Sequence, residues 1–243
     1  MTIFVVPDLH GRTCWQEPAQ HFLDTHGPTD QVVFLGDYVD SFEVGNEQQL
    51  GNFTEVIAFK EENSDRVVLL LGNHCFQYLY LNQVKLFGFN EDLYPALHLY
   101  YKIHRDYFKV VHQVQDTLFA HAGLSRYWLE RHAPVINERR AYLEAQNRPC
   151  QLADGINAMM RLPGGPLLLW ELTEEHGGTA PFDGPVWIRP DAIRASLPPG
   201  LTQVVGHTHV PEITTFRDEA TGARVIFTDC LSTKTEFLTL HLD

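Results

Sequence analysis

The sequence predicts an α/β fold of the mixed α+β kind. Apolar, β-branched stretches alternate with amphipathic stretches in the first third of the chain, which is typical of parallel strands joined by right-handed helical crossovers. Two short apolar runs flank Gln115-Asp116 and indicate a hairpin with a two-residue turn. The end of the chain consists of strand-like runs, and 44% apolar residues are enough for a sizeable core.

The elements are expected in the following order along the chain. The predicted strands are residues 3–6, 32–35, 67–71, 111–114, 117–120, 201–205, 212–216, 224–228 and 236–241. The predicted helices are residues 14–23, 47–62 and 76–84. The aromatic-rich segment 87–111 is interpreted as helix packed in the core, with an aromatic platform for substrate as the alternative.

We expect a single domain over residues 1–243, with a cap or insertion over 130–185. The periodic pattern loosens in that segment, which contains Pro163-Gly164-Gly165-Pro166 and Gly177-Gly178. It is interpreted as an insertion because the last of the motifs described below lies beyond it.

Bulk properties exclude some classes of protein. The net charge is −13, from 18 basic and 31 acidic residues, which argues against stable binding of nucleic acid. No apolar run is long enough to span a membrane. The four cysteines form no CxxC pair, and the chain starts without a basic, signal-like segment, so free thiols and a cytoplasmic location are expected.

Five short motifs each follow an apolar run, and all of them carry Asp, Asn or His beside Gly. Because loops at strand ends supply the chemistry of open sheets, the five are interpreted as one active site assembled from distant segments. The motifs are Asp8-Leu9-His10-Gly11, Gly36-Asp37-Tyr38-Val39-Asp40, Gly72-Asn73-His74, His121-Ala122-Gly123 and Gly206-His207-Thr208-His209.

The side chains of these motifs are interpreted as a set of candidate metal ligands. Residues two apart in an extended segment project to the same side, so Asp8 and His10 can reach one cation. Seven donors are too many for one transition metal and suit two cations that share Asp37. The candidate ligands are Asp8, His10, Asp37, Asn73, His121, His207 and His209.

The motifs also contain a candidate proton donor for a reaction at such a site. His74 directly follows the candidate ligand Asn73, and Asp40 lies three residues after Asp37. Asp40 could hold the imidazole of His74 in the required tautomer, so His74 is a candidate general acid oriented by Asp40.

The ordered motifs resemble those of the calcineurin-like metallophosphoesterases, over nearly the whole chain from Asp8 to His209. They are closest to the phosphoprotein phosphatase branch, in particular its bacterial and phage-like members and the symmetrical diadenosine tetraphosphate hydrolases. The resemblance implies a four-layer αββα sandwich of two mixed sheets flanked by helices. It also implies one metal on Asp8, His10, Asp37 and His209, and a second on Asp37, Asn73, His121 and His207.

The sequence departs from the branch at two positions. Ser41 stands where the branch usually has a phosphate-binding Arg, and Cys75 stands where it usually has Glu. Arg189, in a Trp-x-Arg element similar to that of bacterial members, is the candidate replacement, and Arg12 is another. Cys75 is either an oxidant-sensitive thiol or a buried, inert one.

The resulting prediction is a dinuclear metal-dependent phosphoesterase in which a metal-bridging hydroxide attacks phosphorus and His74 protonates the leaving group. Mn²⁺ is the expected metal, with Fe, Zn, Ni or Co as alternatives, and Asn73 and an arginine would hold the phosphate. The expected substrate is a phosphomonoester, as in a serine/threonine protein phosphatase, carried by a small molecule, nucleotide or phosphoprotein. The alternatives are a dinucleoside polyphosphate hydrolase or phosphodiesterase, and a non-catalytic scaffold on the same fold.

Overall fold

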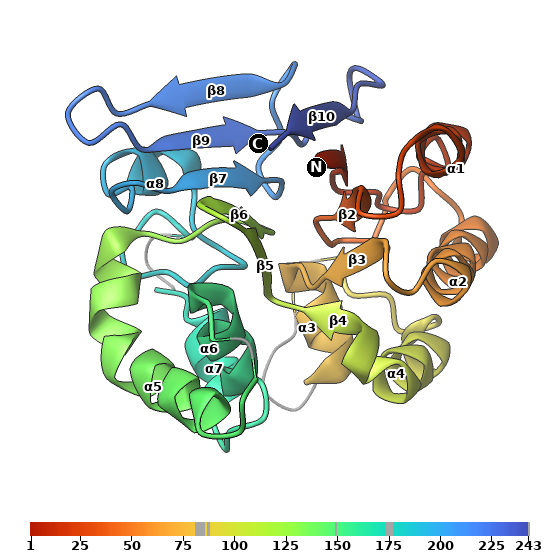
Figure 1. Ribbon diagram of the computed structural model, residues 1–243. Helices are drawn as coiled ribbons and strands as arrows, with labels where there is room; N and C mark the ends of the chain where they lie inside the picture. The colour runs from red at the N-terminus through yellow and green to blue at the C-terminus, as the bar shows by residue number, and fades with distance from the viewer. Residues whose placement is uncertain (81–85, 87, 149, 174–176, 243) are drawn as a thin grey trace. The chain divides into compact units, whose positions relative to one another are not determined.

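The computed structural model describes residues 1–80, 86, 88–148, 150–173 and 177–242. The chain divides into two compact units, Met1–Lys109 with Asp229–Asp243, and Val110–Thr228. Each unit holds one five-stranded mixed sheet with helices beside it (Figure 1). The predicted α/β class, with two mixed sheets flanked by helices, is confirmed. The single domain with a cap over 130–185 stays a prediction.

The sheet of the first unit has the order β10-β1-β2-β3-β4. Strands β1 to β4 run parallel to one another, and β10 pairs antiparallel with β1. Parallel strands are buried on both faces, which explains their continuous apolar runs. The strands are β1 (Thr2–Val6), β2 (Gln31–Phe34), β3 (Val67–Leu70), β4 (Phe108–Lys109) and β10 (Leu238–His241).

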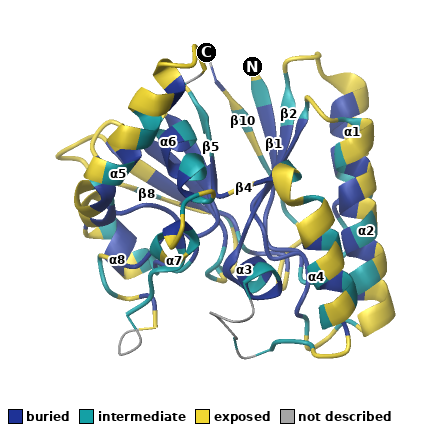
Figure 2. Ribbon diagram, turned by 90° about the horizontal axis from the view of Figure 1, so that it is seen from below, coloured by how far each residue is buried: buried dark blue, intermediate teal, exposed yellow. Residues whose placement is uncertain are grey.

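The longer helices of the first unit have one buried and one exposed face (Figure 2). Helix α1 contacts β2, and helix α2 contacts β3, through their apolar sides. The helices are α1 (Gln16–Thr25), α2 (Asn46–Glu62), α3 (Asn73–Leu79), α4 (Tyr94–Ile103) and the 3₁₀ turn Arg105–Tyr107.

The structure corrects the prediction for residues 87–111. This segment holds helix α4 but then strand β4, in which Phe108 pairs with Leu69 of β3. Tyr101 and Phe108 are buried, so the core interpretation of these aromatic rings is confirmed. Phe87 and residues 81–84 of the predicted third helix lie outside the described residues.

The sheet of the second unit has the order β5-β6-β7-β9-β8. The predicted hairpin is confirmed at both strands, and its turn residue Gln115 has a left-handed φ of 54°. Strands β6, β7 and β9 are parallel, and β8 pairs antiparallel with β9. The strands are β5 (Val111–Val114), β6 (Thr117–Ala120), β7 (Thr202–Val205), β8 (Thr214–Arg217) and β9 (Arg224–Phe227).

The helices of the second unit pack against this sheet and against each other. Helix α6 contacts both α5 and β5, and Ile193 of α8 lies in an apolar cluster with Val205 and Phe227. Ser125 caps α5 by accepting a hydrogen bond from the amide of Trp128 at 2.9 Å. The helices are α5 (Arg126–Glu144), α6 (Leu152–Met159), α7 (Gly165–Trp170) and α8 (Pro190–Arg194). None of the helices in the described ranges has both the length and the apolar character needed to cross a bilayer.

Two motif glycines of the first unit meet backbone to backbone. Gly36 has a φ of 109°, and a Cβ placed on it would stand 2.5 Å from the amide nitrogen of Gly72. A side chain would therefore push apart the loops that follow β2 and β3, in addition to the strain of a left-handed backbone.

We expect Gly36→Ala to lower the free energy of unfolding by about 2–4 kcal/mol, since it combines backbone strain with overpacking. Urea unfolding followed by circular dichroism measures the change. The matched control is Gly51→Ala in α2, where a Cβ meets nothing within 4 Å. There the change should raise stability by up to about 1 kcal/mol. Equal changes in the free energy of unfolding for the two substitutions would contradict the close approach of Gly36 to Gly72.

Candidate active site

Three candidate residues of the first unit follow adjacent parallel strands. Asp8 comes just after β1, Asp37 just after β2, and Asn73 just after β3. The strand register aligns Val6 with Phe34, so the carboxyl ends of the strands lie at one edge of the sheet. The topology therefore places these three side chains at the same edge, where ligands of α/β sheets bind.

Asp8, His10 and Asp37 form a compact group of donors. One donor atom from each residue lies within 4.8 Å of the others. Asp8 is 1% exposed and Asp37 is 2% exposed, and the amide of His74 donates to Asp37 Oδ1 at 3.0 Å. Two buried carboxylates at this separation repel each other when both are ionised, and a bound cation relieves that repulsion. The donor set fits a divalent metal.

The ring of His10 is oriented for a metal. Its Nδ1 lies 2.9 Å from the carbonyl oxygen of Val39. Because a carbonyl only accepts, Nδ1 must carry the proton, which leaves the lone pair of the neutral ring on Nε2. This is the usual arrangement around metal-binding histidines.

Left-handed backbone is concentrated at the candidate residues. His10, Asp37, Asp40 and His207 have φ values of 44°, 47°, 69° and 65°. Such values are uncommon outside glycine and persist where the surroundings enforce them, often at functional sites. The sharp turns re-aim each side chain just beyond the end of its strand.

His74 and Asp40 form the expected pair. His74 Nδ1 lies 2.8 Å from Asp40 Oδ2, and the side chain of Asp40 is fully buried. Gln77 and the hydroxyl of Tyr78 also donate to the Asp40 carboxylate. Burial, followed by the charge of Asp40, raises the pKa of Tyr78, so its phenol remains protonated as a donor.

Gln77 and Tyr78 were missed by the sequence interpretation. They lie three and four residues after His74 in α3, and residues at these spacings share one face of a helix. That spacing is the signal that could have identified them.

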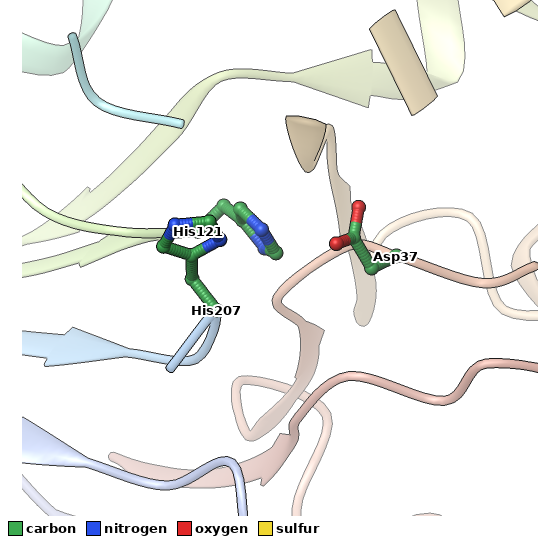
Figure 3. A group of neighbouring side chains, drawn as sticks. All are labelled: Asp37, His121 and His207. Carbon is green, nitrogen blue, oxygen red and sulfur yellow. The ribbon is translucent and has the colours of Figure 1, made fainter. Parts of the chain in front are cut away.

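His121 and His207 lie beside each other in the second unit. They follow the neighbouring strands β6 and β7, and their ring centroids are 5.0 Å apart (Figure 3). The Nε2 atom of His207 lies 3.1 Å from the carbonyl of Trp187, so the proton is on Nε2 and the lone pair of the neutral ring is on Nδ1. Figure 3 also draws Asp37, on the loop that follows β2 of the first unit.

Arg189 is hydrogen-bonded to the last motif. Its Nη1 donates to Thr208 Oγ1 at 3.1 Å, and its Nε donates to the carbonyl of Gly177 at 3.3 Å. The guanidinium is therefore held at Thr208, the residue between His207 and His209. The side chain of His209 is exposed on the same loop.

Arg12, the second candidate for binding phosphate, and Ser41, which stands where the branch usually has Arg, both have hydrogen-bond partners nearby in the chain or on the neighbouring loop. Arg12 Nη2 lies 3.3 Å from Glu43 Oε2, and its Nη1 donates to the carbonyl of Leu9. Ser41 Oγ accepts hydrogen bonds from the amides of Glu43 and Val44, at 3.1 and 3.0 Å. Ser41 thus shapes the loop before α2.

Comparison with known proteins gives the class. The family model of the calcineurin-like phosphoesterases matches residues 1–211, and the chain belongs to this family. It is a metallophosphoesterase, a hydrolase of phosphate ester bonds. The family resemblance inferred from the motifs is thereby confirmed. No curated protein matches the chain.

Solved structures similar to this chain have low sequence identity to it. A protein serine/threonine phosphatase from Saccharomyces cerevisiae, with similarity to human phosphatase PP5, is 16% identical with a TM-score of 0.50, over 94% of this chain and 67% of that one. A putative diadenosine tetraphosphatase is 16% identical with a TM-score of 0.49, over 94% and 83% of the two chains. A metallophosphoesterase from Sphaerobacter thermophilus is 13% identical with a TM-score of 0.42, over 99% and 84%.

Cys75 is packed inside the first unit. Its side chain is fully buried, and burial, followed by the charge of Asp37, raises the pKa of its thiol to about 12. The thiolate is the reactive form of cysteine, so these surroundings favour the inert interpretation.

We expect iodoacetamide to label Cys14 and Cys150, which are partly exposed, well before Cys75 and Cys230, which are buried. Peptide mass spectrometry of the native protein over time measures the order. Labelling of Cys75 as fast as Cys150 would contradict the observed burial. A sample unfolded in urea, in which all four should react, is the control.

Proposed function

We propose that this chain is a dinuclear metal-dependent phosphoesterase that acts on phosphomonoesters, with His74 as the proton donor to the leaving group. The observation that carries the proposal is the His74–Asp40 hydrogen bond of 2.8 Å, next to the donor group of Asp8, His10 and Asp37. The rings of His10 and His74 have centroids 5.4 Å apart, so the proton donor lies beside a proposed ligand.

The proposed ligands divide into two sets that share Asp37. Asp8, His10, Asp37 and His209 would hold one cation, and Asp37, Asn73, His121 and His207 would hold the other. Mixed nitrogen and oxygen donors without thiolate suit Mn²⁺ first, and Fe, Zn, Ni or Co as alternatives. When bound, such a pair of cations supplies an activated water and neutralises charge on the phosphate.

His74 would act through its Nε2. The buried carboxylate of Asp40 accepts a hydrogen bond from Nδ1–H, which fixes the ring and stabilises its charged form. Gln77 and Tyr78 hold the carboxylate itself in place. Nε2 is then the atom that transfers a proton to the departing oxygen.

The phosphate would be held by Asn73 and Arg189, with Arg12 as a weaker candidate. Asn73 is 3% exposed at the start of α3. Arg189 donates a hydrogen bond to Thr208, which lies between the two histidines of the last motif. Its planar guanidinium is suited to phosphate oxygens. The pairing of Arg12 with Glu43 makes it less available.

Initial rates on p-nitrophenyl phosphate and on its bis-ester test the substrate class. A metal-stripped, Mn²⁺-reconstituted sample should hydrolyse the monoester much faster than the diester, and the stripped sample should be inactive on both. Comparable diester rates would favour the alternative of a phosphodiesterase or dinucleoside polyphosphate hydrolase. If the metal-bound protein turned over no phosphate ester, the remaining interpretation would be a non-catalytic scaffold.

The role of His74 is tested by comparing how much its substitution lowers kcat on substrates with poor and good leaving groups. We expect His74→Ala to lower kcat by about 10²–10⁴-fold on an alkyl phosphate and by less on p-nitrophenyl phosphate, because nitrophenolate leaves without a proton. Asp40→Asn should show the same dependence with a smaller loss. The exposed His21→Ala on α1 is the control and should behave as wild type. An equal loss of kcat on both substrates would contradict the proposal that His74 is the general acid.

A further inference from the structure

The buried carboxylate of Asp40 is held by donors that themselves have a second partner. Gln77 and Tyr78 both donate to this carboxylate from neighbouring positions of α3. Each of them also accepts a hydrogen bond from a backbone amide of the segment that leads into α4. Leu86 donates to Gln77 Oε1 at 3.0 Å, and Asn90 donates to the hydroxyl of Tyr78 at 3.2 Å. Two short chains of hydrogen bonds therefore connect Asp40 to this segment.

The two backbone amides fix the direction of these hydrogen bonds. An amide N–H only donates, so the hydroxyl oxygen of Tyr78 accepts from Asn90 and the hydroxyl proton is left for Asp40. In the same way, Gln77 Oε1 faces the amide of Leu86, which leaves Nε2 for the carboxylate. The segment before α4 thus makes both side chains donors toward Asp40.

Packing also holds the ring of Tyr78 in place. Its side chain is fully buried, and the rings of Phe89 and Tyr101 stack on it at centroid distances of 5.3 and 6.2 Å. The carbonyl oxygen of Tyr78 lies 2.7 Å from Nδ1 of His98 in α4. Movement of the hydroxyl away from Asp40 is therefore opposed by close-packed neighbours.

The side chain of Asn90 sets the position of its own backbone amide. Asn90 Oδ1 accepts from the amides of Asp92 and Leu93, both at 3.1 Å, which closes the turn before α4. Its Nδ2 donates to Oδ1 of Asn46, the first residue of α2, at 2.6 Å. Asn90 thus joins the first turns of two helices to the hydroxyl of Tyr78.

The carboxylate of Asp40 carries this positioning to His74. Oδ2 of Asp40 lies 2.8 Å from His74 Nδ1, and Oδ1 is the atom that accepts from Tyr78. The two oxygens belong to one planar group, so a hydrogen bond at Oδ1 restricts the plane in which Oδ2 meets the imidazole. Proton transfer depends on such placement, because Nε2 must come within hydrogen-bond distance of the leaving oxygen.

We propose that Tyr78 is a positioning residue for the proton donor, and that Asn90 acts on the same donor through Tyr78. The inference rests on the proposed function, since His74 as general acid is the group that they position. Neither residue is among the proposed ligands of metal or phosphate. Their substitution therefore slows proton donation to the leaving group and leaves the binding of substrate unchanged.

Steady-state kinetics of the Mn²⁺-loaded protein on two esters test this inference. On glycerol 2-phosphate, an alkyl phosphate, Tyr78→Phe should lower kcat about five- to twentyfold and change KM by less than about twofold, since it removes one hydrogen bond to a charged group. On p-nitrophenyl phosphate kcat should fall by less than about twofold, because nitrophenolate leaves without a proton. Asn90→Ala should lower kcat on the alkyl ester about two- to fivefold, with the same dependence on the leaving group.

Double substitutions separate positioning from a general structural role. In the His74→Ala background, neither Tyr78→Phe nor Asn90→Ala should lower kcat further, because no proton donor is left to position. Losses that multiply in these double variants, or that are equal on the two esters, would overturn the positioning role. Asn90→Ala removes no group that contacts Asp40, so it carries the same test if Tyr78→Phe does not fold.

Tyr107→Phe is the matched control. The hydroxyl of Tyr107 also donates to a carboxylate, that of Glu61, at 3.1 Å and outside the proposed site. Both rates should therefore stay within about twofold of wild type. An active wild type whose kcat is unaffected by Tyr78→Phe would overturn this inference alone. A wild type that hydrolyses neither ester would overturn the proposed function as well, so the two failures are distinguished.

Discussion

The parallel pairing of β1, β2 and β3 decides where the polar residues of the first unit lie. Their aligned carboxyl ends bring Asp8, Asp37 and Asn73 to one edge, although these residues are far apart in the sequence. Gly36 and Gly72 let the two inner loops touch. The arrangement is costly, because it buries carboxylates near each other and places Asp37 in left-handed backbone. Such costs persist where a ligand or reaction requires them.

The segment from Asp40 to Phe42 passes from a fully buried carboxylate to an exposed ring within two residues. The buried end is held by three side-chain donors, and it orients His74. At the exposed end, Gln49 accepts a hydrogen bond from the amide of Ser41, and the ring of Phe42 lies against Gly88, as does the imidazole of His74.

Much of the fold follows from local patterns in the sequence. The hairpin of β5 and β6 was predicted at its exact strand bounds, because its two apolar runs and two-residue turn are adjacent in the chain. Helix α2 begins at Asn46, one residue before its predicted start, and ends at Glu62 as predicted. The pairing of His74 with Asp40 was also expected, because each of the two lies within three residues of a candidate metal ligand.

The sequence by itself determined the class of fold, the family and the candidate ligands, because apolar periodicity and closely spaced motif residues are local properties. Only the tertiary structure decided which distant groups meet. Strand β4 is too short to have a pattern and exists through its pairing with β3. The hydrogen bonds that Gln77 and Tyr78 donate to Asp40, and the burial of Cys75, likewise depend on contacts between segments separated in the chain. Such contacts leave no periodic signal, because the packing of the whole unit sets them.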